Sequence, residues 1–234
     1  MSVLEVIVAR RSLKLGLAVA LAMSVHLLLA LGYWWLENLP HELFGTAVFI
    51  LLGWHLYKNQ NWFRNLARGR YGLRRILIAA FHLALLANTV ILLITSLFVS
   101  KSLFRFFGLP DSPLLSEIHW FSAYWVVVAV GVHLGLQWPR LGAILVAVFN
   151  LPKTGPAITW ALRALAAAAA VFGILSLPVL DVGTKLTFGY SVDFWDFEAS
   201  VLPFFLRWGG VVALAAVCAR LADAALARRR PVRT

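Results

Sequence analysis

Six histidines are the residues of this chain best suited to do chemistry. Each lies inside or at the end of a long apolar stretch; they are His26, His41, His55, His82, His119 and His133. Ionisable side chains inside a membrane are energetically unfavourable and often functional. A single membrane histidine could equally be a hydrogen-bonded helix contact, but six of them in four apolar stretches favour a shared role.

Four of these histidines form two pairs with the same spacing. His41 and His55 are 14 residues apart, and so are His119 and His133. Fourteen residues make close to four turns of an α-helix and a rise of about 21 Å. Each helix would therefore present one imidazole near each membrane face, with His41 level with His119 and His55 level with His133.

Two imidazoles that face each other across a helix bundle can supply both axial ligands of a haem iron. The two levels therefore predict two haem b groups, with the four paired histidines as metal ligands. Glycines near these histidines would leave room for the flat macrocycle; they are Gly45, Gly53, Gly131 and Gly135. The alternative is that small residues simply let helices approach each other.

The two remaining histidines are harder to place. His82 falls near the cytoplasmic end of its stretch, where it could replace an inner haem ligand or hydrogen-bond a propionate. His26 could border a quinone or a haem. For each of them, a hydrogen-bonded packing role is the simpler interpretation. The single cysteine, Cys218, excludes a thiolate-ligated iron–sulfur cluster and a CxxCH haem attachment.

The composition predicts that these residues are held by membrane helices. Hydrophobic residues make up 62% of the 234 residues and charged residues 13%, against about 45–50% and 25% in soluble domains. We expect an all-α polytopic membrane bundle of six helices. These would cover about 13–36, 41–57, 73–99, 118–138, 158–180 and 202–226. Residues 1–150 would form a four-helix haem-binding bundle, and residues 151–234 would add two helices joined by an outside connection.

The distribution of charge predicts the orientation. With the N-terminus in the cytoplasm, 17 of the 21 basic residues lie inside and eight of the ten acidic residues lie outside. This satisfies the positive-inside rule with both termini cytoplasmic. Orientation and contact with anionic membrane lipid explain the net charge of +11, so we expect no nucleic-acid partner.

Several stretches in order resemble a known family. Residues 39–45 read LPHELFG and are followed by Trp54-His55, while residues 119–125 read HWFSAYW and residues 133–138 read HLGLQW. The connection before the last span carries the aromatic and acidic string Asp193–Glu198. In these features the chain resembles the flavinylation-associated cytochromes, which are bacterial membrane proteins.

This resemblance implies a b-type cytochrome of the bacterial inner membrane, with His41, His55, His119 and His133 as haem ligands. It also implies an extracytoplasmic partner that carries flavin, with Asp193–Glu198 at the contact. We expect electron transfer between quinol and an outside flavin- or haem-carrying protein. One alternative is a reductase that passes electrons to ferric iron or another small acceptor, although no GxGxxG fingerprint is present. A less favoured alternative is a non-redox transporter or assembly factor that uses intramembrane histidines.

Overall fold

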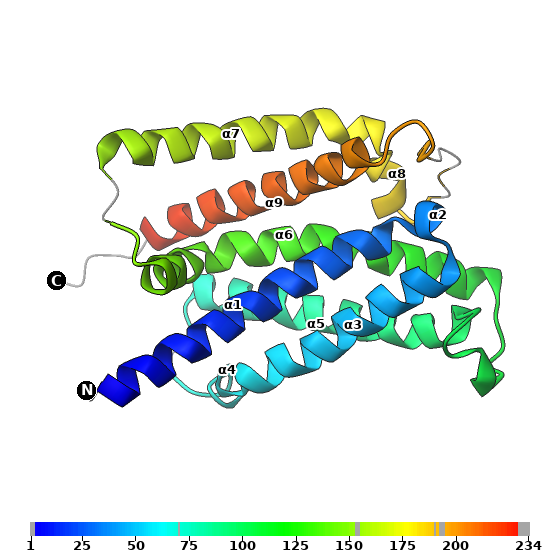
Figure 1. The fold of residues 1–234 in the computed structure, drawn as a ribbon, viewed down its shortest axis with the longest axis horizontal. Coiled ribbons are helices and arrows are strands. Elements are labelled where there is room, and N and C mark those ends of the chain that lie inside the picture. Colours follow the sequence, from blue (N-terminus) through cyan, green and yellow to red (C-terminus); the bar gives the residue numbers. More distant parts are fainter. Residues whose placement is uncertain (1–2, 70, 153–154, 190, 192–194, 229–234) are drawn as a thin grey trace. The chain divides into compact units, whose positions relative to one another are not determined.

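The computed structural model describes residues 3–69, 71–152, 155–189, 191 and 195–228, and these residues form helices and connections without strands. The expected all-α class is therefore confirmed for the described chain (Figure 1). The helices are α1 (Val3–Leu31), α2 (Tyr33–Leu36), α3 (Asn38–Lys58), α4 (Gln60–Arg64), α5 (Leu73–Val99), η1 (Arg105–Phe107), α6 (Pro113–Phe149), α7 (Pro156–Val179), α8 (Val182–Leu186) and α9 (Leu202–Arg228).

Five of the described helices are long and apolar enough to cross a membrane: α1 from Arg10 onward, α5, α6, α7 and α9. The expected second span lies in α3, which is not among these five. Its 21 residues would rise about 31 Å, close to the thickness of the hydrocarbon core. However, His41, Glu42 and Lys58 shorten its apolar part. A sixth span therefore stays a prediction.

Several helix ends differ from the expected boundaries; α1 begins at Val3 and α6 at Pro113, both before the expected starts at 13 and 118. The sequence predicts a first span that continues to residue 36, but α1 ends at Leu31 and the separate short helix α2 follows Gly32. Glycine weakens a helix because of its backbone entropy. The sequence also predicts that the fourth span ends at residue 138, but α6 continues through Pro139 to Phe149. Proline is tolerated in membrane helices where neighbouring groups satisfy the freed backbone carbonyl.

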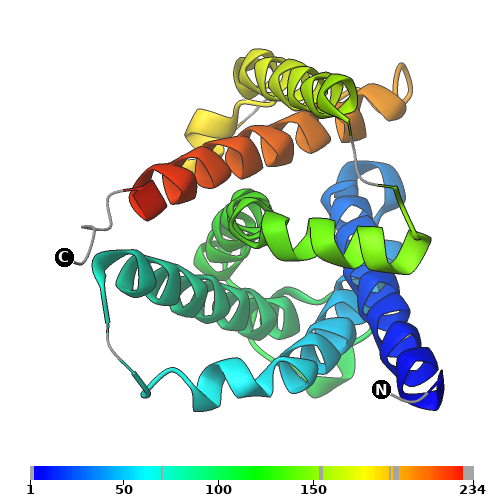
Figure 2. The ribbon, with the colours of Figure 1, turned by 90° about the vertical axis from the view of Figure 1, so that its left-hand side faces the viewer.

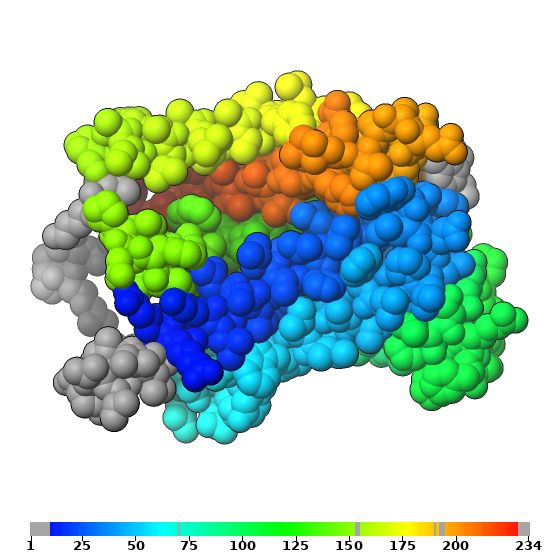
Figure 3. All heavy atoms as spheres, in the orientation of Figure 1, coloured from blue at the N-terminus to red at the C-terminus, as the bar shows by residue number. Residues whose placement is uncertain are grey.

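The chain divides into two compact units: residues 1–69 with 137–159, and residues 70–136 with 160–234. In the first unit, α1 packs along α3 (Figure 3). The Arg10 guanidinium donates hydrogen bonds to the carbonyl oxygen of Ala147, at 3.3 Å, and to the side chain of Asn150. The functional division at residue 150 stays a prediction.

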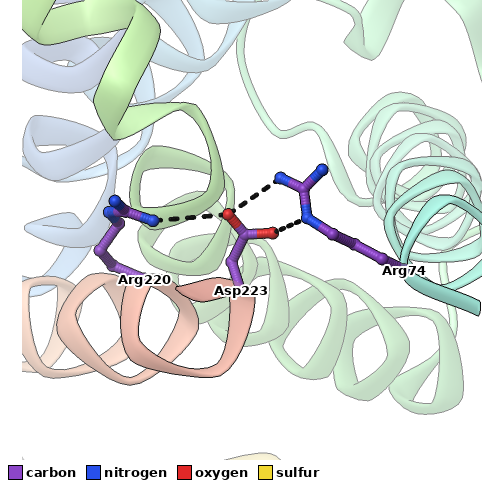
Figure 4. Close-up of polar contacts among 3 residues, drawn as sticks. All are labelled: Arg74, Arg220 and Asp223. Atoms are coloured by element: carbon purple, nitrogen blue, oxygen red, sulfur yellow. Dashed lines mark hydrogen bonds and ion pairs between the residues drawn. The ribbon is translucent and has the colours of Figure 1, made fainter. Parts of the chain in front are cut away.

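In the second unit, α9 contacts α5, α6 and α7. The rings of Tyr124 on α6 and Trp208 on α9 are stacked, with centroids 5.5 Å apart. Trp208 is almost fully buried, as is Val127 of α6. Near the other end of α9, Asp223 is buried and forms ion pairs with Arg74 of α5 and Arg220 (Figure 4).

Apolar side chains remain on the outer faces of these helices. Leu165 of α7 and Leu221 of α9 are 67% and 65% exposed. Long helices with such surfaces need an apolar environment, because soluble monomers rarely expose large contiguous apolar patches. The described chain is therefore typical of a multi-pass membrane protein.

Some expectations from the sequence concern residues outside the described ranges. They are Asp193 and Phe194 of the aromatic and acidic string, and the basic residues Arg70, Lys153, Arg229, Arg230 and Arg233, which the charge distribution assigns to the cytoplasmic side.

Close helix approach in the second unit predicts one stability effect. The paired helices α7 and α9 lie side by side (Figure 2), and a Cβ atom added to Gly173 would collide with the backbone carbonyl of Gly210. We expect Gly173→Ala to destabilise the protein by about 1–3 kcal/mol, because the two backbones must move apart. Thermal unfolding in detergent, followed by circular dichroism, measures this effect.

Gly16 of α1 provides the matched control, because a Cβ atom there would meet no described atom within 4 Å. Gly16→Ala should be neutral or stabilising by up to about 1 kcal/mol, since alanine favours a helix. Equal unfolding temperatures for the two variants would contradict the assigned contact.

Candidate functional site

The structure places each histidine pair on one continuous helix. His41 and His55 both lie in α3, and His119 and His133 both lie in α6 before Pro139. The prediction that each pair shares a helix is therefore confirmed, with its 14-residue spacing intact. The pairing of the α3 histidines with those of α6 stays a prediction.

His41 makes a specific hydrogen bond to the neighbouring helix. Its Nδ1 atom lies 2.7 Å from the backbone oxygen of Ala30 on α1, and the Tyr33 ring packs edge-on against it at 5.3 Å. A carbonyl oxygen only accepts hydrogen bonds, so Nδ1 carries the proton. In a neutral imidazole this leaves a lone pair on Nε2, and metal-ligating histidines are commonly oriented in this way.

His119 is buried against α5. Its Nδ1 atom lies 3.4 Å from the hydroxyl oxygen of Thr95 and 3.5 Å from that of Ser96. Both hydroxyls already donate to backbone carbonyls of α5, at 2.9 and 2.7 Å. Nδ1 is therefore the donor in these long, weak contacts, and Nε2 again keeps its lone pair.

The sequence alone does not identify Thr95 and Ser96 as part of the site. Their signal is that two adjacent hydroxyl residues interrupt the apolar end of α5. Hydroxyl residues in spans are often explained by bonds to their own helix, which both of them also make. Their second role depends on α6 and is visible only in the fold.

His82 lies beside His133 within the second unit. The two ring centroids are 5.0 Å apart, and the ring planes meet at 78°. The Nδ1 atom of His82 donates to the carbonyl of Ile78 at 2.6 Å. His82 therefore lies directly beside His133, and its role as an inner haem ligand or as a hydrogen-bond partner of a propionate stays a prediction.

His26 and His55 have different surroundings in the first unit. His26 donates from Nδ1 to the carbonyl of Ala22 in its own helix, at 2.7 Å, and packs against Phe44. These contacts fit the packing role given above as the simpler interpretation. His55 is half-buried near the end of α3.

The four glycines fall into two groups. A Cβ atom on Gly131 would lie 2.6 Å from the carbonyl oxygen of Val212, and one on Gly135 would collide with the backbone of Ala216. Both glycines therefore allow α6 to approach α9, which is the packing alternative considered above. At Gly45 and Gly53 of α3, an added Cβ would meet no described atom within 4 Å. Close packing among the described residues does not account for these two glycines.

The described imidazoles occur singly or in pairs. No group of three or more histidine, cysteine, aspartate or glutamate side chains in the described ranges is arranged to hold a metal ion. The arrangement offers single imidazoles on long apolar helices, and a haem iron with one axial ligand from each side needs such groups.

Part of the acidic connection before α9 is described. The backbone N–H groups of Glu198 and Ala199 donate to the Asp196 carboxylate, both at 3.0 Å, and the Trp195 indole donates to the Ser200 carbonyl at 2.6 Å. These bonds form a compact turn that precedes α9.

Comparisons with protein-family models, with curated proteins and with solved structures find no match for this chain.

Proposed function

We propose that the protein is a di-haem b-type membrane cytochrome that carries electrons across the bacterial inner membrane. The observation that carries this proposal is the hydrogen bond made by the ring of His41 on the continuous helix α3. Its Nδ1 proton is bonded to the Ala30 carbonyl, so that Nε2 is the ring nitrogen with the lone pair that a metal ligand needs. On α6, His119 also carries its proton on Nδ1, where it contacts the hydroxyl groups of Thr95 and Ser96.

The four histidines would hold the two haem groups in two levels, His41 with His119 and His55 with His133. Each haem iron, once bound, supplies a reversible one-electron carrier. The chain would orient His41 and His119 through hydrogen bonds to Nδ1 and keep water away with apolar helices. Open space beside Gly45 and Gly53 would accommodate part of the macrocycles.

The proposal requires α3 to cross the membrane as the sixth span. Ile50, near the middle of α3, is 70% exposed, and Leu43 is 50% exposed. Both side chains would be stable against lipid. Six spans place both termini in the cytoplasm and satisfy the positive-inside rule.

The proposed partners are membrane lipid, quinol or quinone, and an extracytoplasmic protein that carries flavin or haem. The resemblance to flavinylation-associated cytochromes favours a flavin-carrying protein. The outside turn containing Asp196 and Glu198 would contribute acidic groups to that contact.

Purified protein should show a b-type reduced-minus-oxidised spectrum, with about two haems per chain by pyridine-haem quantitation. About one haem would mean that one histidine pair is structural. A protein without haem after expression with haem supplementation would contradict the proposal and favour the transporter alternative. Reduction of a small ferric chelate without a partner protein would favour the reductase alternative.

A further inference from the structure

The end of α5 and the connection that follows it line a partly open cavity of about 530 Å³ within the second unit. This volume falls in the range of small-ligand sites. Its lining includes Leu97, Phe98, Lys101, Phe104, Arg105 and Asp111.

The connection that forms one wall is locally ordered. The Ser100 hydroxyl accepts a hydrogen bond from the backbone N–H of Phe104 at 2.9 Å, and the short helix η1 follows. Gly108 then ends η1 with a φ of +59°, a conformation that favours glycine. The cavity is therefore shaped by specific backbone turns.

The charged groups of the cavity have both signs. Arg105 and Asp111 are exposed, and neither forms an ion pair within the described residues. Lys101 adds a second cation, whereas Leu97, Phe98 and Phe104 supply apolar and aromatic surface. A ligand that suits this lining has a flat apolar body, a hydrogen-bond acceptor for the cations and a donor for the carboxylate.

The cavity lies at the end of α5 that contacts His119. Thr95 and Ser96, which contact the His119 ring, immediately precede Leu97 and Phe98 in α5. These four residues span about one helical turn. A ligand in the cavity would lie at the same end of the helix pair as His119.

We infer that this cavity binds the headgroup of a quinone or quinol. Arg105 and Lys101 would donate hydrogen bonds to one ring oxygen, Asp111 would accept one from a quinol hydroxyl, and the phenylalanines would contact the ring. Binding makes and breaks no covalent bond. The inference rests on the proposed function, because it places the electron donor or acceptor beside the outer haem ligand.

Calorimetric titration of the full-length protein in phosphatidylcholine nanodiscs, with ubiquinone-1 and with menadione, tests the inference. We expect Arg105→Gln and Asp111→Asn each to weaken the binding of at least one quinone about tenfold, a difference of about 1.4 kcal/mol. Arg207→Gln is the matched control, because Arg207 belongs to α9, packs over Phe172 and does not line the cavity. It should leave the affinity within about twofold.

Haem content and unfolding temperature are measured for every variant, so that this inference can fail separately from the proposed function. Quinone binding that depends on Arg105 in a protein lacking haem would support the cavity and contradict the cytochrome. Unchanged affinity in both cavity variants would overturn the quinone site alone. Native mass spectrometry tests a further contrary outcome. If Arg105→Gln loses a bound phospholipid that the unmodified protein and the other variants retain, and its quinone affinity is unchanged, the cavity is a lipid-headgroup site instead.

Discussion

Replacing His41 with alanine should lower the haem content from about two per chain to about one. The variant lacks an Nε2 ligand at the outer level, while His55 lies about 21 Å farther along the same helix. The inner haem should therefore remain, and its own contribution to the b-type absorbance should be unchanged. Pyridine-haem quantitation of the purified variant, together with a low-temperature spectrum, measures both quantities.

His26→Ala is the matched control for this experiment. His26 is also half-buried and also donates from Nδ1 to a backbone carbonyl, but it lies on α1 outside the spaced pairs. We expect this variant to keep about two haems. If His41→Ala retained a full haem complement, the assignment of His41 would be wrong. If His26→Ala lost a haem, the ligand set would need His26.

The helical placement of the histidines could be predicted because it depends on local sequence. Fourteen residues return to nearly the same helix face, and the stretches from His41 to His55 and from His119 to His133 contain no helix-breaking proline. The extension of α6 beyond Pro139 could not be predicted in the same way. Proline usually marks a boundary in sequence, and here the apolar residues that follow it continue the helix.

The contacts of the site depend on residues far apart in the chain. The sequence predicts that Gly131 and Gly135 leave space around a cofactor, yet their nearest neighbours are backbone atoms of α9. Neither glycine carries a local signal that identifies this partner. The same limit applies to Thr95 and Ser96, whose contact with His119 exists only because α5 packs beside α6.

The charge distribution predicts the side of the membrane for Arg74 and Asp223 but not their interaction. They are 149 residues apart, and the sequence suggests only that both are cytoplasmic. In the structure, the Arg74 guanidinium donates to both oxygens of the carboxylate, at 2.7 and 3.1 Å (Figure 4). Arg220 contributes one longer contact at 3.5 Å. The ion pair therefore links α5 to α9 in a region where neither helix has a glycine that would indicate close packing.

Replacing Arg74 with methionine should destabilise the protein by about 2–4 kcal/mol. Asp223 is only 4% exposed, so the variant would leave a buried carboxylate with the weak Arg220 contact alone. The expected value is below the roughly 3–5 kcal/mol of fully buried pairs because the Arg74 side chain is 38% exposed. Unfolding by sodium dodecyl sulfate in mixed micelles measures the change. Arg163→Met, at an exposed arginine over Trp160 of α7, should change stability by no more than about 0.5 kcal/mol.

The double variant Arg74→Met/Asp223→Leu separates the ion pair from the loss of the arginine stem. If the unpaired carboxylate causes the destabilisation, its removal should restore most of the lost stability, because buried ion pairs are often replaced by apolar residues with little change. The arginine stem contributes packing that methionine largely keeps. A double variant as unstable as Arg74→Met would show that the guanidinium stabilises α5 and α9 by some other contact, and the assigned role of Asp223 would be wrong.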